Sequence, residues 1–194
     1  MTIIYLVRHG EYENPKYTFP GRSPEGFPLS DRGRKQAQAL ATYFANKPVT
    51  ALYSSPIPRC RETAEILSRS VHLPVVVDDR LIEVRTMAEG VSMRVFDETN
   101  GELSYTPEYL AKGAETMEEL ASRMSGFIKE KRQEHKGKEV LIVTHGDPMR
   151  YVVMNYMGMP IDFEASRQIA IPLAGGYQID FDEAGKALVK PIVI

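Results

Sequence analysis

Four short apolar runs, rich in β-branched side chains, recur along the chain and predict strands. They cover residues 2–7, 49–53, 74–77 and 139–144. A short run of apolar residues without polar alternation is typical of a strand covered on both faces, as in a parallel sheet. The hydrophobic pattern therefore predicts a sheet with strands at these four places.

Between these runs, apolar residues recur at helical spacing. Ser30 can cap a helix with apolar residues at positions 37, 40, 41 and 44, and a second helix is expected from about Pro58 to Ser70. Thr116 and Glu119 form a capping box for a third helix, which carries the best amphipathic stripe in the chain. A fourth helix is expected from Asp147 to about Gly158.

Two long segments lack such periodicity. Residues 10–29 are polar and contain several Pro and Gly, which predicts a long functional loop. Residues 84–113 show no clear period and are interpreted as an insertion or lid. The tail is expected to hold two or three strands, with turns at Gly175-Gly176 and Asp182 to Gly185.

Strands that alternate with helices imply right-handed β-α-β crossovers. The predicted fold is a three-layer α/β/α sandwich with a mostly parallel central sheet. No repeat or linker divides the sequence, so residues 1–194 are interpreted as a single domain.

Composition narrows the possible functions. A formal net charge of −2 provides no general attraction to nucleic acid or to anionic membranes, so neither is expected as a partner. The lone cysteine, Cys60, excludes an internal disulfide framework and fits a reducing compartment. No apolar segment has the length of a membrane span or the form of a secretory signal. The expected location is the cytoplasm.

Charged and polar residues follow the ends of the predicted strands. Arg8-His9 follows the first strand, Arg59 the second, Glu83 the third and His145-Gly146 the fourth. In an open α/β sheet, the loops at the carboxyl ends of the strands meet in one crevice. We therefore expect two histidines, two arginines and one glutamate to converge there.

This set of side chains suits phosphoryl transfer. A neutral imidazole such as His9 can attack phosphorus, and the arginine forks match paired phosphate oxygens. His145 can donate to an equatorial oxygen as charge develops. Glu83 is the candidate acid for the leaving alkoxide, and a neighbouring phosphate would raise its pKa. Asp147 is an outside candidate for the same role.

Five motifs give the sequence a family resemblance. They are Leu6 to Glu11, Pro28-Leu29-Ser30 through Gly33 to Gln36-Ala37, Ser54-Ser55-Pro56 with Arg59 and Thr63-Ala64, Leu81-Ile82-Glu83, and Val143 to Gly146. In this order they resemble the histidine phosphatase superfamily, in the branch that includes cofactor-dependent phosphoglycerate mutase. The similarity spans about residues 3–150.

The resemblance implies specific roles. It implies that His9 is phosphorylated, that Glu83 donates the proton, and that the phosphate is held by Arg8, Arg59 and His145. It places Asn14, Gly21 and Arg22 near the substrate and the Gly146 amide near the phosphate. It implies no metal.

Two departures from the family pattern stand out. The chain has no tryptophan and carries residues 85–90 where many members have a Gly-x-Trp-Glu-Gly-like stretch. Asn14 also lies one residue nearer the histidine than in mutase-like members.

Several alternatives remain open. The preferred hypothesis is a metal-independent phosphomonoesterase that needs no cofactor and acts on a small phosphorylated substrate. A phosphoglycerate mutase, primed by 2,3-bisphosphoglycerate, is the first alternative, and the short Glu83 to His145 segment favours the phosphatase. A metallohydrolase using His9, His145, Glu83 and Asp147 and a non-catalytic phosphate-binding module are more remote alternatives.

Other residues receive more general predictions. Cys60 is expected to be a buried apolar side chain rather than a nucleophile. Residues 12–27 and 84–113 are expected to cover the pocket, and they hold Tyr12, Tyr17, Phe19, Phe27, Arg94 and Phe96. The chain is expected to be a monomer or a homodimer. Four arginines are interpreted as exposed residues on helices: Arg61, Arg69, Arg123 and Arg132.

Overall fold

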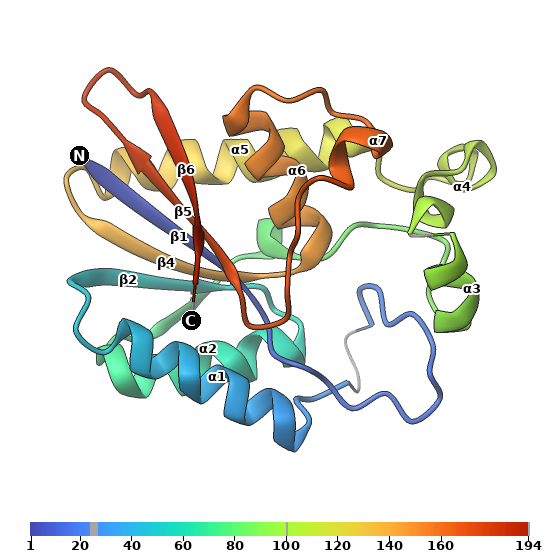
Figure 1. Cartoon of the computed structure of the whole chain (residues 1–194), viewed down its shortest axis with the longest axis horizontal. Coiled ribbons are helices and arrows are strands. Elements are labelled where there is room, and N and C mark those ends of the chain that lie inside the picture. Colours follow the sequence, from blue (N-terminus) through green and yellow to red (C-terminus); the bar gives the residue numbers. More distant parts are fainter. Residues whose placement is uncertain (24–26, 100, 194) are drawn as a thin grey trace.

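A computed structural model describes residues 1–23, 27–99 and 101–193, and it contains a six-stranded sheet between two helical layers (Figure 1). The strands run in the order β3-β2-β4-β1-β5-β6. Their bounds are β1 Thr2–Arg8, β2 Val49–Ser54, β3 Val75–Val77, β4 Glu139–Thr144, β5 Gly176–Phe181 and β6 Ala187–Ile192. The first four are mutually parallel, and β5 and β6 add an antiparallel edge. The predicted sandwich with a mostly parallel sheet is confirmed.

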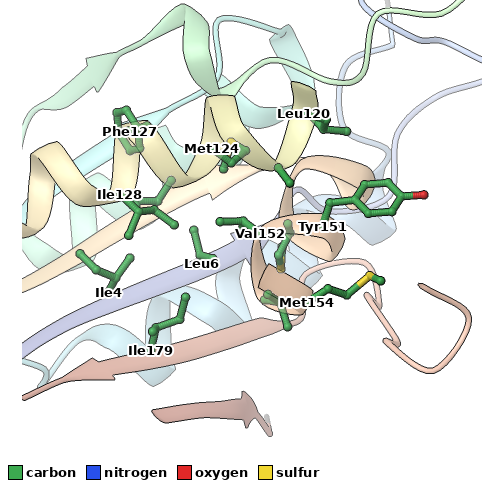
Figure 2. Packing of buried hydrophobic residues seen from close by; sticks show 14 of the residues in the cluster. Ile4, Leu6, Leu120, Met124, Phe127, Ile128, Tyr151, Val152, Met154 and Ile179 are labelled. Atoms are coloured by element: carbon green, nitrogen blue, oxygen red, sulfur yellow. The ribbon is translucent and has the colours of Figure 1, made fainter. Parts of the chain in front are cut away.

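Helices α1 (Asp31–Phe44) and α2 (Pro58–Val71) cover one face of the sheet, and α5 (Met117–Glu134) and α6 (Gly146–Met157) cover the other (Figure 1). Alternate residues of β1 pack against the two helical layers. Tyr5 and Val7 pack with the α1–α2 layer, whereas Ile4 and Leu6 pack beneath α5 and α6 (Figure 2). This burial on both faces explains why the strand is continuously apolar in sequence.

Two predicted helix caps are confirmed, and α6 begins one residue before the predicted Asp147. The Ser30 hydroxyl accepts a hydrogen bond from the Gly33 amide at 3.0 Å and thereby caps α1. Thr116 and Glu119 form the reciprocal capping box at the start of α5. Within the described part of the chain, no helix has both the length and the apolar composition needed to cross a membrane.

The structure corrects the expectation that residues 84–113 are irregular. They contain α3 (Met93–Glu98), the 3₁₀ helix η2 (Glu102–Tyr105) and α4 (Pro107–Ala111). Helices of four to six residues span fewer than two turns, so no apolar period can develop. Asn100 of this segment and residues 24–26 of the expected loop lie outside the described residues.

Smaller elements complete the chain, and the tail differs slightly from the prediction. Gly176 is the first residue of β5 rather than part of a turn, while the turn at 182–185 is present. A 3₁₀ helix, η1 (Asp79–Leu81), follows β3, and α7 (Phe163–Ser166) follows α6.

The carboxyl ends of the parallel strands lie at one edge of the sheet. Arg8 at the end of β1 pairs with Thr144 at the end of β4, and Ser54 of β2 pairs with Val143. The segments that follow these strands therefore begin side by side. This register brings the candidate residues together.

Candidate active site

His9 directly follows β1 and is 2% exposed. Its Nδ1 lies 2.8 Å from the Gly10 carbonyl oxygen, which can only accept, so Nδ1 carries the proton and Nε2 holds the free electron pair. Gly10 packs against the start of α1, where a Cβ would come within 2.6 Å of the Gly33 carbonyl oxygen. A residue without a side chain is therefore needed for the backbone to approach α1 this closely.

Arg59, in the first turn of α2, joins the two histidines. It is 1% exposed, and its Nε donates to His9 Nε2 at 3.2 Å. One terminal nitrogen lies 3.2 Å from His145 Nδ1 and also donates to the Gly21 carbonyl at 2.8 Å. Because a guanidinium only donates, both imidazole nitrogens that face Arg59 are acceptors.

His145 follows β4 and occupies the N-cap position of α6, fully buried. Its Nε2 lies 2.8 Å from the hydroxyl of Ser55, the residue after β2. Its ring centre lies 5.3 Å from that of His9. The two histidines, 136 positions apart in sequence, thus form one cluster around Arg59.

Both imidazoles are held neutral. Burial lowers the pKa of His9 well below its usual range, and the charges of Arg59 and Arg8 lower it further. Burial and then Arg59 do the same to His145. A neutral His9 keeps its electron pair available for attack on an electrophile.

Two guanidinium nitrogens in this cluster are buried without an acceptor. Within the described residues, nothing accepts a hydrogen bond from Arg8 Nε or from one terminal nitrogen of Arg59. Another Arg8 nitrogen donates to the Ile171 carbonyl at 2.8 Å. Buried donors are normally paired. Unpaired guanidinium N–H groups beside two neutral imidazoles therefore indicate an anion site.

Glu83 lies close to this cluster, with Oε2 3.9 Å from His145 Nδ1. Burial, followed by the negative charge of Asp147, raises the pKa of Glu83 to about 7. The Val84 amide, which donates to its Oε1 at 2.9 Å, opposes this shift. Near neutral pH, Glu83 is thus present in both forms and can donate or accept a proton.

A pocket of about 330 Å³ opens beside these residues. Arg8, Glu83 and Gly146 are among the residues that line it. Phe19 and Phe96, from the two segments expected to cover the site, also line it and stack at 4.1 Å between ring centres. The remaining lining residues are Asp97, Gly101, Tyr105, Asp147, Arg150 and Phe163.

Known proteins resemble this chain in sequence and in fold. The profile of the histidine phosphatase superfamily (branch 1) matches residues 4–192. The chain belongs to the histidine phosphatase superfamily. It is 30% identical over 169 residues to phosphoserine phosphatase 1 of Hydrogenobacter thermophilus, covering 83% of this chain and 79% of the relative. It is 28% identical over 193 residues to a probable phosphoglycerate mutase, GpmB, of Shigella boydii, covering 95% and 87%.

A solved structure shares the fold of this histidine phosphatase. YhfR of Bacillus stearothermophilus superposes with a TM-score of 0.81 over 98% of this chain and 96% of that protein, at 24% identity. The relatives thus include proteins named as phosphatases and as mutases.

Three predicted substrate residues of this histidine phosphatase contact the protein itself. The Asn14 side chain donates a hydrogen bond to the Thr18 carbonyl at 2.9 Å and accepts one from the Thr18 amide at 3.1 Å. The Gly21 carbonyl accepts a hydrogen bond from Arg59. The Arg22 guanidinium donates to the Glu83 carbonyl and to Glu115. Gly146 does reach the site, where a Cβ would lie 3.5 Å from the Arg8 guanidinium.

Sequence reasoning missed part of the site. Arg123, interpreted as exposed, is largely buried and bonds the backbone around Glu83. Arg150 also lines the pocket and pairs with Asp147 at 2.7 Å. Their i, i+3 spacing on a helix is the signal that could have found this pair. Phe163 and Tyr105 carry no such local signal.

Cys60 of this histidine phosphatase is fully buried, as predicted. Burial raises the pKa of its thiol well above the usual range, so it is protonated and a poor nucleophile. In the described part of the chain, no group of three His, Cys, Asp or Glu side chains could hold a metal ion. The donor set around His9 is rich in guanidinium instead, which would repel a cation.

Proposed function

We propose that this histidine phosphatase hydrolyses a small phosphate monoester through a phosphohistidine at His9. The observation that carries the proposal is the orientation of His9, whose Nδ1 proton is held by the Gly10 carbonyl while Nε2 faces Arg59. This arrangement presents a neutral nitrogen electron pair to an anion site. Unpaired guanidinium donors of Arg8 and Arg59 supply that site.

In the first step, the phosphoryl group takes the place that Arg59 holds beside His9. Nε2 forms a bond to phosphorus as the bond between phosphorus and the leaving oxygen breaks. Arg8, Arg59 and the Gly146 amide bind the phosphoryl oxygens, and the phosphate favours a protonated His145 that donates from Nδ1. Glu83, in its protonated form, gives its proton to the leaving oxygen.

In the second step, water attacks phosphorus. Glu83, now a carboxylate, accepts the proton of the water as the bond between phosphorus and Nε2 breaks. His9 is thereby restored with its Nδ1 proton still held by Gly10. A pKa of about 7 suits both roles, because Glu83 can exchange protons in either direction near neutral pH.

We further propose that the reaction requires no metal ion or other cofactor and that the protein works in the cytoplasm. Residues 84–113 act as a lid, because Phe96 of α3 stacks on Phe19 over the pocket. We rank the mutase second, because mutases of this family carry a longer insertion between the acid and the second histidine. Water is expected to reach the phosphohistidine here.

The proposal is tested with p-nitrophenyl phosphate, with and without chelator, and with His9→Ala. We expect chelator-insensitive hydrolysis and a loss of at least about 1000-fold in His9→Ala. Rapid quenching at high pH is expected to trap a phosphoenzyme that is stable to alkali and labile to acid. His72→Asn is the matched control, because His72 is exposed and adopts a left-handed conformation that asparagine tolerates.

Full activity in His9→Ala would overturn the proposal. Loss of activity on adding chelator would favour the metallohydrolase. A second assay supplies 3-phosphoglycerate with 2,3-bisphosphoglycerate. Rapid isomerisation with negligible phosphate release would establish the mutase in place of the phosphatase.

A further inference from the structure

Glu115 is a buried carboxylate that takes no part in the proposed reaction. It is 6% exposed and precedes the N-cap of α5. Its Oε1 accepts a hydrogen bond from Arg123 Nε at 2.8 Å. Its Oε2 accepts two more, from a terminal nitrogen of Arg123 at 2.9 Å and from a terminal nitrogen of Arg22 at 2.8 Å. The Arg85 amide donates to the same Oε2 at 3.2 Å. One carboxylate thus fixes two arginines from distant segments.

Both arginines direct their other donors at the backbone that carries Glu83. Arg22 Nε donates to the Glu83 carbonyl at 2.7 Å. One Arg123 nitrogen donates to the Arg80 carbonyl at 2.6 Å and the Ile82 carbonyl at 2.9 Å. Three carbonyls of residues 80–83 are therefore held by two guanidinium groups.

Glu115 stays ionised over the pH range in which Glu83 titrates. Burial by itself would raise the pKa of Glu115, but the hydrogen bonds and charge of Arg123, with the charge of Arg22, outweigh burial and lower it. Hydrogen bonds between charged groups are about twice as strong as neutral ones. The carboxylate that binds the two arginines is therefore present in both protonation states of Glu83.

We propose that Arg22, Glu115 and Arg123 form a clamp that positions the carboxyl group of Glu83 for proton transfer to the leaving oxygen. This inference rests on the proposed role of Glu83 as the acid. The three are positioning residues, because they contact the backbone of residues 80–85 and one another. Displacing a catalytic group by about 1 Å can cost roughly 100-fold in rate.

The clamp also joins the two halves of the site. The Gly21 carbonyl accepts a hydrogen bond from Arg59. The next residue, Arg22, donates one to the Glu83 carbonyl. Residues 21–22 therefore connect the phosphate-binding arginine with the acid. Arg22, which the family resemblance places near the substrate, belongs to the clamp in this proposal.

The test compares two aryl esters of nearly equal size. p-Nitrophenolate leaves readily without protonation, whereas the more basic phenolate from phenyl phosphate needs the acid. We expect Arg22→Met, Arg123→Met and Glu115→Gln to lose about tenfold or more kcat/KM with phenyl phosphate beyond any loss with p-nitrophenyl phosphate. Arg132→Met is the control: Arg132 is a half-buried arginine of α5 that donates to the Gly185 carbonyl.

Glu83→Gln separates this inference from the proposed function. If Glu83→Gln shows no greater loss with phenyl phosphate, Glu83 is not the acid and the proposed mechanism fails. If Glu83→Gln is selective but the clamp variants lose both substrates equally, the clamp has only a structural role and the inference is overturned. Arg22 lies on a loop with a quarter of its side chain exposed, so Arg22→Met provides the answer even if Arg123→Met does not fold.

Discussion

The hydroxyl of Ser55 and Nε2 of His145 lie 2.8 Å apart, and both residues are fully buried. Since Arg59 donates to Nδ1 of the same ring, Nε2 carries the hydrogen and donates it to Ser55. Ser55 follows β2 and His145 follows β4, so strand pairing fixes both the ring and its tautomer. When a phosphate draws Arg59 away, Nδ1 becomes free to take up a proton and face the anion.

The first prediction concerns Ser55→Ala. Loss of this hydrogen bond is expected to lower kcat by about tenfold, the equivalent of roughly 1.4 kcal/mol for one buried hydrogen bond. Ser54→Ala is the matched control, because the hydroxyl of Ser54 is equally buried but donates to the backbone. Steady-state kinetics with p-nitrophenyl phosphate measure both, and equal effects would contradict a role for Ser55 in orienting His145.

The second prediction concerns the pH dependence of kcat/KM. Phosphorylation needs protonated Glu83, whose pKa is raised to about 7, so activity should fall as pH rises through that value. It also needs neutral His9, whose pKa is lowered, so the acidic limb should lie below that of an ordinary histidine. Profiles corrected for substrate ionisation test this. If the pH profile of kcat/KM for Glu83→Gln still falls on the alkaline side, that fall belongs to a group other than Glu83.

The third prediction concerns Asp147, whose charge helps to raise the pKa of Glu83. Asp147→Asn removes this charge and keeps one of the two oxygens that accept hydrogen bonds from Tyr105 and Arg150, so one of these two bonds is retained. The pKa of Glu83 should therefore fall, and the alkaline limb should move to lower pH. Asp97→Asn is the control, because Asp97 lines the same pocket but is exposed, where water screens its charge. Equal shifts in both variants would contradict the assignment.

The fourth prediction concerns the packing of α1 against the segment that follows His9. An alanine Cβ at Gly33 would overlap the Glu11 carbonyl oxygen, so Gly33→Ala should lower the free energy of unfolding by about 2 kcal/mol. Gly126→Ala is the opposite control: Gly126 lies within α5 with open space around its Cα. That variant should gain about 0.5–1 kcal/mol from helix propensity. Urea denaturation measures both, and a neutral Gly33→Ala would contradict the packing argument.

Much of the fold follows from local patterns in the sequence. The continuous apolar run of β1 indicates burial on both faces, and Ser30, Thr116 and Glu119 mark helix starts through bonds within one turn. The short helices at 93–111 were missed because fewer than two turns give no period. Local signals thus predict long elements better than short ones.

By itself, the sequence determined the α/β class, the order of elements and the group of His9, Arg59, Glu83 and His145 that strand order brings to one edge. Those are consequences of periodicity and of the direction of parallel strands. Only the tertiary structure decided which nitrogen of each histidine carries the proton and that Arg22 and Arg123 hold the backbone of Glu83. Apart from the contact of His9 with the adjacent Gly10 carbonyl, those facts depend on contacts between residues 40 to 100 positions apart, for which a single sequence carries no local pattern.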